Sequence, residues 1–406
     1  MANLAINGGK AISETRLPVP EWPPVKESTV EKLKEIYLSR QWSFNSAAEQ
    51  AFETEFAAYH GARYGIFMSN GTVTLECALE ALGIGPGDEV IVPALTWIAT
   101  AMAVRYVGAT PVFADIEPTT LCLDPKAAEA AITPATRAII PVHLYGGMAD
   151  LEALQAIADR HQLAIVEDCA HMQGGLWNGR GVGSWGAVGS FSFQQSKTLA
   201  AGESGICLTN DPKLAELLYR AKHIGYSRYD KQGQAGTPPP VGLTCHNYRG
   251  LALQAQILRD QLTDLKALIQ RYGQSAAILA DAVAGIPGIR LQSPGRLASP
   301  QGYYALGVIV DGPEWHDIPI PRIIEAIAAE GMGCINGTYG SVYRHLLFNM
   351  APSEYRLPAG GCPVADGLGS LRTAVIMHYA LYYPETAEAL GRILQKLAAN
   401  VAELKK

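Results

Sequence analysis

Residues 189–197 of the sequence read Gly189-Ser190-Phe191-Ser192-Phe193-Gln194-Gln195-Ser196-Lys197, a run of small and aromatic residues that ends in a lone lysine. Upstream, residues 163–168 read Leu163-Ala164-Ile165-Val166-Glu167-Asp168 and end in a carboxylate. Both runs are short, apolar and bounded by polar residues or glycine, which predicts buried strands. One strand that ends in Asp168 and one that runs into Lys197 predict an α/β sheet with both side chains at one edge.

The region around these two runs alternates short apolar stretches with amphipathic ones. The apolar stretches predicted as strands are residues 64–68, 89–93, 111–115, 137–144, 163–167, 188–193 and 205–208. The amphipathic stretches predicted as helices between them are residues 73–82, 97–107, 125–132 and 151–161. This alternation is typical of a mostly parallel sheet, here of seven strands, whose ligands bind at the carboxyl ends of the strands.

The rest of the chain has a different pattern and predicts further parts of the molecule. Residues 212–223 and 251–271 are predicted helices on either side of a proline-rich, exposed loop at Gln232–Gly242. Beyond residue 276, predicted helices (275–284, 321–330, 385–404) mix with predicted strands (303–310, 373–377), as in a smaller α+β domain. We therefore expect an N-terminal arm (1–50) that packs with the small domain, a large domain (51–265) and a small C-terminal domain (266–406).

The composition is that of an ordinary globular protein. The chain has 406 residues, 48% of them hydrophobic and 17% charged, with a net charge of −6 and no dense Lys/Arg block. This balance argues against nucleic acid as a partner. The sequence shows no signal-peptide pattern and no apolar run long enough to span a membrane. Its seven cysteines are scattered, without a CxxC pair, which favours free thiols in a reducing cytoplasm.

Two candidate binding features follow the first two predicted strands. Ser69-Asn70-Gly71-Thr72 opens a predicted helix, whose first N–H groups and dipole suit a phosphate dianion at Gly71 and Thr72. The alternative is a plain helix cap formed by Ser69 or Asn70. Trp97 comes just after the next strand, where its face could stack on a flat ring, although packing in the core is the alternative use of a tryptophan.

Asp168 and His171 follow the strand at residues 163–167. A buried carboxylate is costly unless it is paired, and a pyridinium nitrogen would be a suitable partner for Asp168. His171 could contact a phenolic oxygen of the same ring. The alternatives are a helix N-cap for Asp168 and a buried, satisfied histidine for His171. No third ligand stands at a useful spacing, so no metal site is predicted here.

Lys197 completes the pattern. It lies among Phe191, Phe193 and Leu199, and burial together with a nearby cationic ring lowers the pKa of an amine. These properties suit pyridoxal phosphate chemistry, in which a lysine forms a Schiff base with the cofactor and a carboxylate keeps its ring nitrogen protonated. Ser192 is predicted to donate to the cofactor phosphate. Lys197 and Asp168 are therefore the predicted catalytic residues, with pyridoxal 5'-phosphate covalently bound to Lys197.

The chain resembles the DegT/StrS family of fold-type I pyridoxal-phosphate aminotransferases. The resemblance begins at Leu4-Ala5-Ile6-Asn7-Gly8-Gly9 and is densest between residues 69 and 262. It implies the roles given above for Gly71, Thr72, Trp97, Asp168, His171, Ser192 and Lys197. The segment Cys245-His246-Asn247-Tyr248-Arg249 is similar to the family's Asn-Tyr-Arg segment, whose asparagine reaches the phosphate of the neighbouring subunit. The resemblance thus implies a homodimer with shared active sites and a cofactor contact from Asn247.

Within the family, residues 167–171 and 192–203 look most like the glutamine-dependent inosose aminotransferases of aminocyclitol pathways. Aminohydroxybenzoate synthases share much of this pattern, and nucleotide-linked keto-sugar aminotransferases are a further alternative. One departure is Ser204, which replaces a glycine of the family's Gly-Glu-Gly-Gly turn and could tighten that turn or narrow the approach to Lys197. The Gln232–Gly242 loop is a second place where family members differ and where substrate choice could reside.

The resemblance implies transfer of an amino group from L-glutamine or L-glutamate to a polyhydroxylated keto-cyclitol or keto-sugar. Lys197 would move the proton between the donor's α-carbon and the cofactor. A dehydratase is disfavoured because dehydratases of the family lack the lysine, and a regulator without turnover would need no acid/base lysine. The candidates for lining the acceptor pocket are Trp42, Ser43, His143, Tyr145, Tyr343 and His345, each of which could instead have a structural role.

Overall fold

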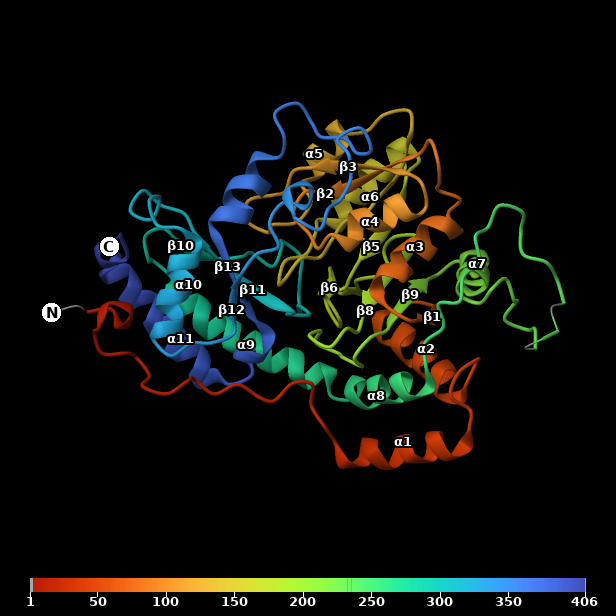
Figure 1. Cartoon of the computed structure of the whole chain (residues 1–406), viewed down its shortest axis with the longest axis horizontal. Coiled ribbons are helices and arrows are strands. Elements are labelled where there is room, and N and C mark those ends of the chain that lie inside the picture. Colours follow the sequence, from red (N-terminus) through yellow and green to blue (C-terminus); the bar gives the residue numbers. More distant parts are fainter. Residues whose placement is uncertain (1–2, 232, 235, 406) are drawn as a thin grey trace.

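The computed structural model describes residues 3–231, 233–234 and 236–405, and it is built around a seven-stranded sheet (Figure 1). In spatial order the strands are β1 (Tyr64–Met68), β9 (Gly205–Thr209), β8 (Val188–Ser192), β5 (Ala164–Asp168), β4 (Thr136–Ile139), β2 (Glu89–Pro93) and β3 (Thr110–Ala114). Strand β9 is antiparallel to both of its neighbours, and the other pairs are parallel. The predicted mostly parallel seven-stranded sheet is confirmed.

Helices cover this sheet, so consecutive residues of its strands are buried, rather than alternate ones. In β2, for example, all residues from Val90 to Pro93 are buried. The helices that connect its strands are α3 (Gly71–Ala81), α4 (Ala99–Tyr106), α5 (Pro125–Ala130) and α6 (Leu151–His161), and α7 (Pro212–Lys222) follows its last strand in chain order, β9. Strand β4 ends at Ile139 instead of the predicted residue 144. Pro141 follows closely and has no N–H to continue the ladder.

A second sheet of four antiparallel strands is formed by the C-terminal part of the chain (Figure 1). Its order is β10 (Ile289–Leu291), β11 (Ala305–Val310), β13 (Thr373–Met377) and β12 (Ile335–Gly337). The long helices of this part are α9 (Leu265–Val283), α10 (Ile320–Ala329) and α11 (Pro384–Ala399). Shorter elements are the hairpin β6 (Leu176–Trp177) and β7 (Arg180–Gly181), the 3₁₀ helices η2 (Val342–Arg344), η4 (His378–Leu381) and η5 (Val401–Lys405), and the π-helix η3 (Ala365–Gly369).

The prediction of a helix break between residues 271 and 275 is wrong. Helix α8 (Ala252–Leu262) ends at Leu262, and α9 continues through Gly273 without interruption. The hydroxyl of Thr263 donates to the Asp260 carbonyl and helps to end α8, whereas Gly273 is tolerated inside α9, where Tyr272 and Ser275 are buried. The observed break between α8 and α9 lies next to the domain boundary predicted at residue 265. The three-part division of the chain stays a prediction.

The N-terminal segment contains elements that the sequence pattern did not predict: η1 (Ala5–Asn7), α1 (Glu27–Ser39) and α2 (Ala47–His60). In Figure 1 this segment starts beside the four-stranded sheet and continues to α1, which lies against α8. Helix α1 has no buried residue. Helix α2 buries Phe52 and Phe56 and packs on both β1 and α8. The segment therefore contacts both parts of the molecule.

A buried ion cluster joins α2 and α7 to β1. The side chain of Lys222 has no exposed surface, and its Nζ lies 2.7 Å from Glu49 Oε1 and 3.2 Å from Glu53 Oε1. The same Nζ donates to the Phe67 carbonyl at 2.8 Å. Because of the two carboxylates, the pKa of Lys222 is raised even though its burial acts in the opposite direction. The cluster supplies a full set of partners for a charge inside the protein.

The loop between α7 and α8 extends away from the sheet (Figure 1, green). Its base is tied by Arg220, whose guanidinium donates to the Gly225 and Thr237 carbonyls and to the Thr237 hydroxyl. In the predicted Gln232–Gly242 loop, Gln232 and Ala235 lie outside the described residues, and Val241 is fully exposed. Among the residues described, no helix is both long and apolar enough to cross a membrane.

Candidate active site

A cavity of about 1010 Å³ lies where the parallel strands end. Residues from separate strand ends line it, since the carboxyl ends of parallel strands meet at one edge of a sheet. The predicted site residues that line it are Gly71, Thr72, Trp97, Asp168, His171, Ser192 and Lys197. The structure therefore brings together every candidate of the sequence analysis that follows a strand of the seven-stranded sheet, apart from the acceptor-pocket candidates treated below.

One end of the cavity is formed by the start of α3. Asn70 caps this helix, and its Oδ1 accepts hydrogen bonds from the Thr72 and Val73 N–H groups at 3.0 Å each. The helix cap considered as an alternative is thus present, and Gly71 and Thr72 still face the cavity. A Cβ at Gly71 would lie 2.6 Å from the Cβ of Ser192, so only glycine allows the helix start to approach β8 this closely.

Asp168 sits at the end of β5 and is 5% exposed. Its Oδ2 accepts a hydrogen bond from the Thr100 hydroxyl at 2.8 Å, and its Oδ1 accepts one from the Ala170 N–H at 3.2 Å. The Thr100 hydroxyl in turn lies 3.0 Å from that of Thr96. Burial raises the pKa of Asp168, while Thr100, Ala170 and the positive Lys197 act to lower it. The carboxylate is oriented by two donors and has capacity for a cationic partner.

His171 is held in one orientation beside three tyrosines. Its Nδ1 accepts a hydrogen bond from the Tyr145 N–H at 3.1 Å, so its Nε2 carries the proton when the ring is neutral. That Nε2 lies 3.3 Å from the Tyr339 hydroxyl, and the ring stacks on Tyr304 with centroids 3.8 Å apart. Burial, and then the charge of Lys197, lower the pKa of His171 well below its usual value. It is a neutral hydrogen-bonding group at the cavity wall.

Lys197 projects into the cavity from the loop after β8. Its Nζ lies 4.3 Å from the centroid of the Tyr304 ring. Burial lowers the pKa of this amine to about 8, against the opposing effects of Asp168 and Glu203. An amine with this pKa is partly unprotonated near neutral pH, so it can act both as a nucleophile and as a base.

Trp97 and Asn247 differ in their relation to the cavity. Trp97 is 43% exposed at the cavity wall, and its ring contacts Tyr339 and His345 with centroids 5.3 and 5.9 Å away. It is not a core residue. Asn247 is exposed and does not line the cavity of its own chain; its backbone forms a bridge with His223 instead. Its neighbour Tyr248 does line the cavity.

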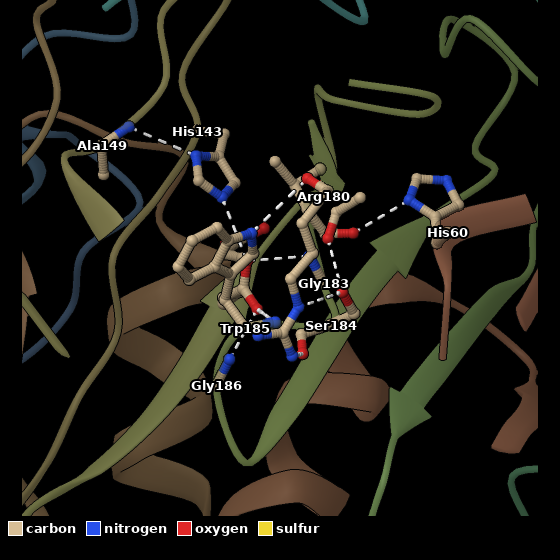
Figure 2. A network of polar contacts seen from close by, with 12 residues as sticks. His60, His143, Ala149, Arg180, Gly183, Ser184, Trp185 and Gly186 are labelled. Atoms are coloured by element: carbon tan, nitrogen blue, oxygen red, sulfur yellow. Dashed lines mark hydrogen bonds and ion pairs between the residues drawn. The ribbon is translucent and has the colours of Figure 1, made fainter. Parts of the chain in front are cut away.

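His143, proposed from the sequence for the acceptor pocket, is fully buried elsewhere (Figure 2). Its Nε2 lies 3.5 Å from Glu167 Oε2, and its Nδ1 accepts from the Ala149 N–H. The Glu167 carboxylate also accepts from the N–H groups of the turn after β7, which are those of Gly183, Trp185 and Gly186. Figure 2 shows His143 on one side of this network and the turn on the other. The prediction that His143 lines the acceptor pocket is wrong. His143 contacts Glu167, and the Glu167 side chain points to the face of β5 opposite Asp168, away from the cavity.

The other acceptor-pocket candidates also lie outside the cavity wall. Trp42 stacks on Tyr37 with centroids 5.4 Å apart, and Ser43 follows it. Tyr145 is buried and supports the wall from behind, since its hydroxyl accepts from the Tyr339 N–H. Tyr343 donates to Asp366. His345 lines an adjacent cavity of about 660 Å³ rather than this one, although Tyr339 borders both.

Several wall residues carry no signal in the local sequence. The cavity lining that the sequence analysis missed includes Thr96, Thr100, Gln194, Ser196, Glu203, Tyr304 and Tyr339. Thr96 and Thr100 stand on either side of Trp97 in the stretch after a predicted strand, and this position was a usable signal. Ser204 is fully buried and does not line the cavity, so it does not narrow the approach to Lys197.

Comparison with known proteins places these residues in a family. The model of the DegT/DnrJ/EryC1/StrS aminotransferase family matches residues 23–344. The chain is 37% identical to an L-glutamine:2-deoxy-scyllo-inosose aminotransferase from Micromonospora echinospora, with all of both chains covered. It is 36% identical to an enzyme of the same name from Streptomyces kanamyceticus, with 99% of both chains covered.

Solved structures agree with these matches. The fold is similar to that of a 3-amino-5-hydroxybenzoic acid synthase, with a TM-score of 0.86, 29% identity, and 96% of this chain and 100% of that chain covered. It is also similar to DesV of S. venezuelae, with a TM-score of 0.83, 32% identity, and 95% and 99% covered. On the family match and these full-length relatives, the chain belongs to the DegT/DnrJ/EryC1/StrS aminotransferase family and is a transaminase.

Proposed function

We propose that this transaminase uses pyridoxal 5'-phosphate, bound covalently to Lys197, to move an amino group from L-glutamine to a keto-cyclitol that resembles scyllo-inosose. The observation that carries the proposal is the shared cavity of Asp168 and Lys197, with the start of α3 at its other end. A carboxylate, a lysine of lowered pKa and a helix N-terminus match the ring nitrogen, the aldehyde and the phosphate of this cofactor.

The residues present fit the cofactor. Gly71 lacks the Cβ that would fill the space beside Ser192, which leaves room for a phosphate next to the hydroxyl-bearing side chains of Thr72 and Ser192. Asp168, buried and with two donors already in place, would hold a protonated ring nitrogen. Trp97 presents an exposed face for the ring, and His171 lies on the cavity wall for the ring oxygen. When bound, the cofactor supplies an electron sink for the carbanion that forms when the donor loses its α-proton.

The chain's own contribution to the reaction is proton transfer and orientation. With the cofactor and amino donor bound, Lys197 would be the group that takes up the donor's α-proton and gives a proton back. A pKa near 8 suits both steps at neutral pH, since the amine can accept and release a proton with little cost. Asp168 would hold the protonated ring nitrogen of the bound cofactor by its charge.

The donor and acceptor are inferred from the relatives and from the cavity wall. The full-length relatives are named as L-glutamine:2-deoxy-scyllo-inosose aminotransferases, which supports glutamine and a cyclic polyhydroxy ketone. The hydroxyls of Ser196, Tyr304 and Tyr339 lie on the wall near Lys197, where they can hydrogen-bond to the hydroxyls of such an acceptor. The alternative is an aminohydroxybenzoate-synthase-like reaction, supported by the structural match to that enzyme.

The proposal includes a homodimer in the cytoplasm. Asn247 is exposed at the end of a backbone bridge with His223, which leaves its side chain available for the partner's cofactor phosphate. All seven cysteines are free thiols, as expected in a reducing compartment.

The first experiment is to record the visible spectrum of the protein with bound cofactor while L-glutamine or L-glutamate is added. We expect a yellow protein whose absorption bleaches faster with L-glutamine. Release of amino-cyclitol from scyllo-inosose by the bleached protein would then identify the acceptor class. A protein that stays colourless after incubation with pyridoxal phosphate would contradict the proposal.

The Thr100→Val variant tests the role of Asp168. It keeps the shape of the side chain and removes the hydrogen bond to Oδ2, which helps to lower the pKa of this carboxyl. We expect kcat/KM to fall by about 10- to 100-fold, since a hydrogen bond to a charged group contributes about 1.5–3 kcal/mol. The acidic limb of the pH profile should also move to higher pH, because Asp168 then protonates more easily. An unchanged limb would show that Thr100 does not act on Asp168.

A further inference from the structure

Lys197 belongs to no helix or strand. It lies in the loop between β8 and β9, where the Lys197 N–H donates to the Gln194 carbonyl and the Gln195 N–H to the Gly202 carbonyl. These bonds shape the loop internally but do not attach it to the rest of the molecule. Outside contacts hold the loop beyond Lys197, where Gln261 bonds to both the N–H and the carbonyl of Ala200 and the Thr198 hydroxyl donates to the Gly302 carbonyl. The backbone at Lys197 itself has its own outside contacts.

Two successive carbonyls of this loop are held by side chains from distant parts of the chain. The Nε2 of His378 lies 3.0 Å from the Ser196 carbonyl oxygen, and the indole N–H of Trp22 donates to the Lys197 carbonyl at 3.1 Å. His378 begins η4, directly after β13 of the four-stranded sheet. Trp22 lies in the N-terminal segment ahead of α1.

The two side chains also support each other. The Trp22 and His378 rings meet edge to face with centroids 4.5 Å apart. Burial, and then the charge of Lys197, lower the pKa of His378 to about 4, so the ring is neutral at neutral pH. Because the Ser196 carbonyl can only accept, Nε2 of the neutral ring carries the proton, and Nδ1 accepts from the Tyr272 hydroxyl 3.0 Å away. The orientation of His378 is thus fixed by α9.

We propose that Trp22 and His378 are positioning residues that fix the backbone of Lys197 and thereby the path of its amine in proton transfer. Neither side chain lines the cavity, so they act through the loop and not on the reacting atoms. The proposal rests on the proposed role of Lys197 as the proton-transfer group. In this proposal the N-terminal segment and the four-stranded sheet both help to position the lysine. Their effect on the rate follows because small displacements of a reacting group reduce rates steeply.

The test compares Trp22→Phe with Trp315→Phe. Each change removes one indole N–H that donates to a backbone carbonyl, the carbonyl of Lys197 in the first case and that of Pro287 in the second. In Trp22→Phe the ring that packs on His378 is kept. His378→Leu removes the second donor, and His378→Gln retains an N–H donor and serves as the conservative variant.

The first two measurements use the cofactor-free protein. They are hydrogen exchange in residues 193–201 and the pH dependence of Lys197 acetylation by acetic anhydride, read by mass spectrometry. We expect Trp22→Phe to speed exchange in this loop about tenfold and to raise the pH midpoint of acetylation from about 8 toward the ordinary value for lysine. Trp315→Phe should change neither, even where it lowers the melting temperature by a similar amount.

The third measurement uses the holoenzyme. We expect Trp22→Phe to lower kcat about tenfold with KM for L-glutamine nearly unchanged, His378→Leu to lower it further, and His378→Gln to restore most of the loss. Trp22→Phe that exchanges, acetylates and turns over like Trp315→Phe would overturn the proposal. If the cofactor never attaches to Lys197, the proposed function fails, and the two measurements on the cofactor-free protein still decide whether the loop is held by these residues.

Discussion

Replacing Lys197 with alanine is expected to lower kcat for transamination on the order of 10⁴-fold, because it removes the group that moves the α-proton. The residue lies in the cavity with Asp168 and has a pKa lowered to about 8 by burial. The measurement is a glutamine-dependent turnover assay with cofactor in excess, beside single-turnover bleaching of the bound cofactor. Lys213→Ala, at an exposed position on α7, is the matched control and should be fully active.

The Lys197→Ala variant is not expected to be less stable than the parent protein. The pKa of Lys197 in the folded protein, about 8, is below its ordinary value of 10.5. The folded state therefore binds fewer protons than the unfolded state between these two pH values, and the amine destabilises the fold most below pH 8. Cofactor-free Lys197→Ala should melt at the same or a higher temperature than the parent at pH 7, and this advantage should vanish near pH 11. If Lys197→Ala kept more than a few per cent of the parent's kcat, Lys197 would not be the proton-transfer group.

The Lys222→Met variant is expected to lose about 3–5 kcal/mol of unfolding free energy, the usual cost of removing one partner from a buried ion cluster. Its amine is fully buried and contacts both Glu49 and Glu53. Without it, two carboxylates remain inside the protein without their cation, where α2, α7 and β1 meet. Urea unfolding followed by circular dichroism at pH 7 measures the effect.

The pH dependence of this loss identifies its cause. Burial already raises the pKa of Glu53, and Lys222 is the main group that opposes this rise. In the variant the carboxyls should bind protons more tightly when folded than when unfolded, so stability falls as pH rises. We expect the deficit to be smaller at pH 5 than at pH 8. Adding Glu49→Gln and Glu53→Gln to Lys222→Met should recover part of the loss. A deficit that is independent of pH and unaffected by these changes would instead indicate a packing defect.

The seven-stranded sheet and the centre of the cavity follow from local sequence patterns. Each strand is a short apolar run bounded by polar residues or glycine, and the residues after the runs fall at one sheet edge by the rules of parallel sheets. Gly71, Trp97, Asp168 and Lys197 could therefore be predicted to lie together without any knowledge of tertiary contacts. Each of these residues lies at the cavity because it stands at or shortly after the end of a strand.

The rest of the wall could not be found this way. Tyr304 and Tyr339 come from segments next to the four-stranded sheet, and their approach to His171 depends on how the two sheets pack. Trp22 and His378 reach the lysine loop across 175 and 182 residues of sequence. The error at His143 has a related origin, because a position after a strand does not say which face a side chain takes.

The two carboxylates that end β5 have one further consequence. Glu167 is enclosed by backbone N–H groups of the turn at residues 183–186, and its neighbour Asp168 faces the cavity. A strand displaced by one residue would exchange these surroundings, leaving the longer side chain at the catalytic edge and the shorter one unable to reach the turn. A shift in the pairing of β5 would therefore disturb both the hydrogen bonds that hold the turn and the position of the carboxylate in the cavity. A single-residue insertion or deletion in residues 164–166 should abolish both stability and turnover together.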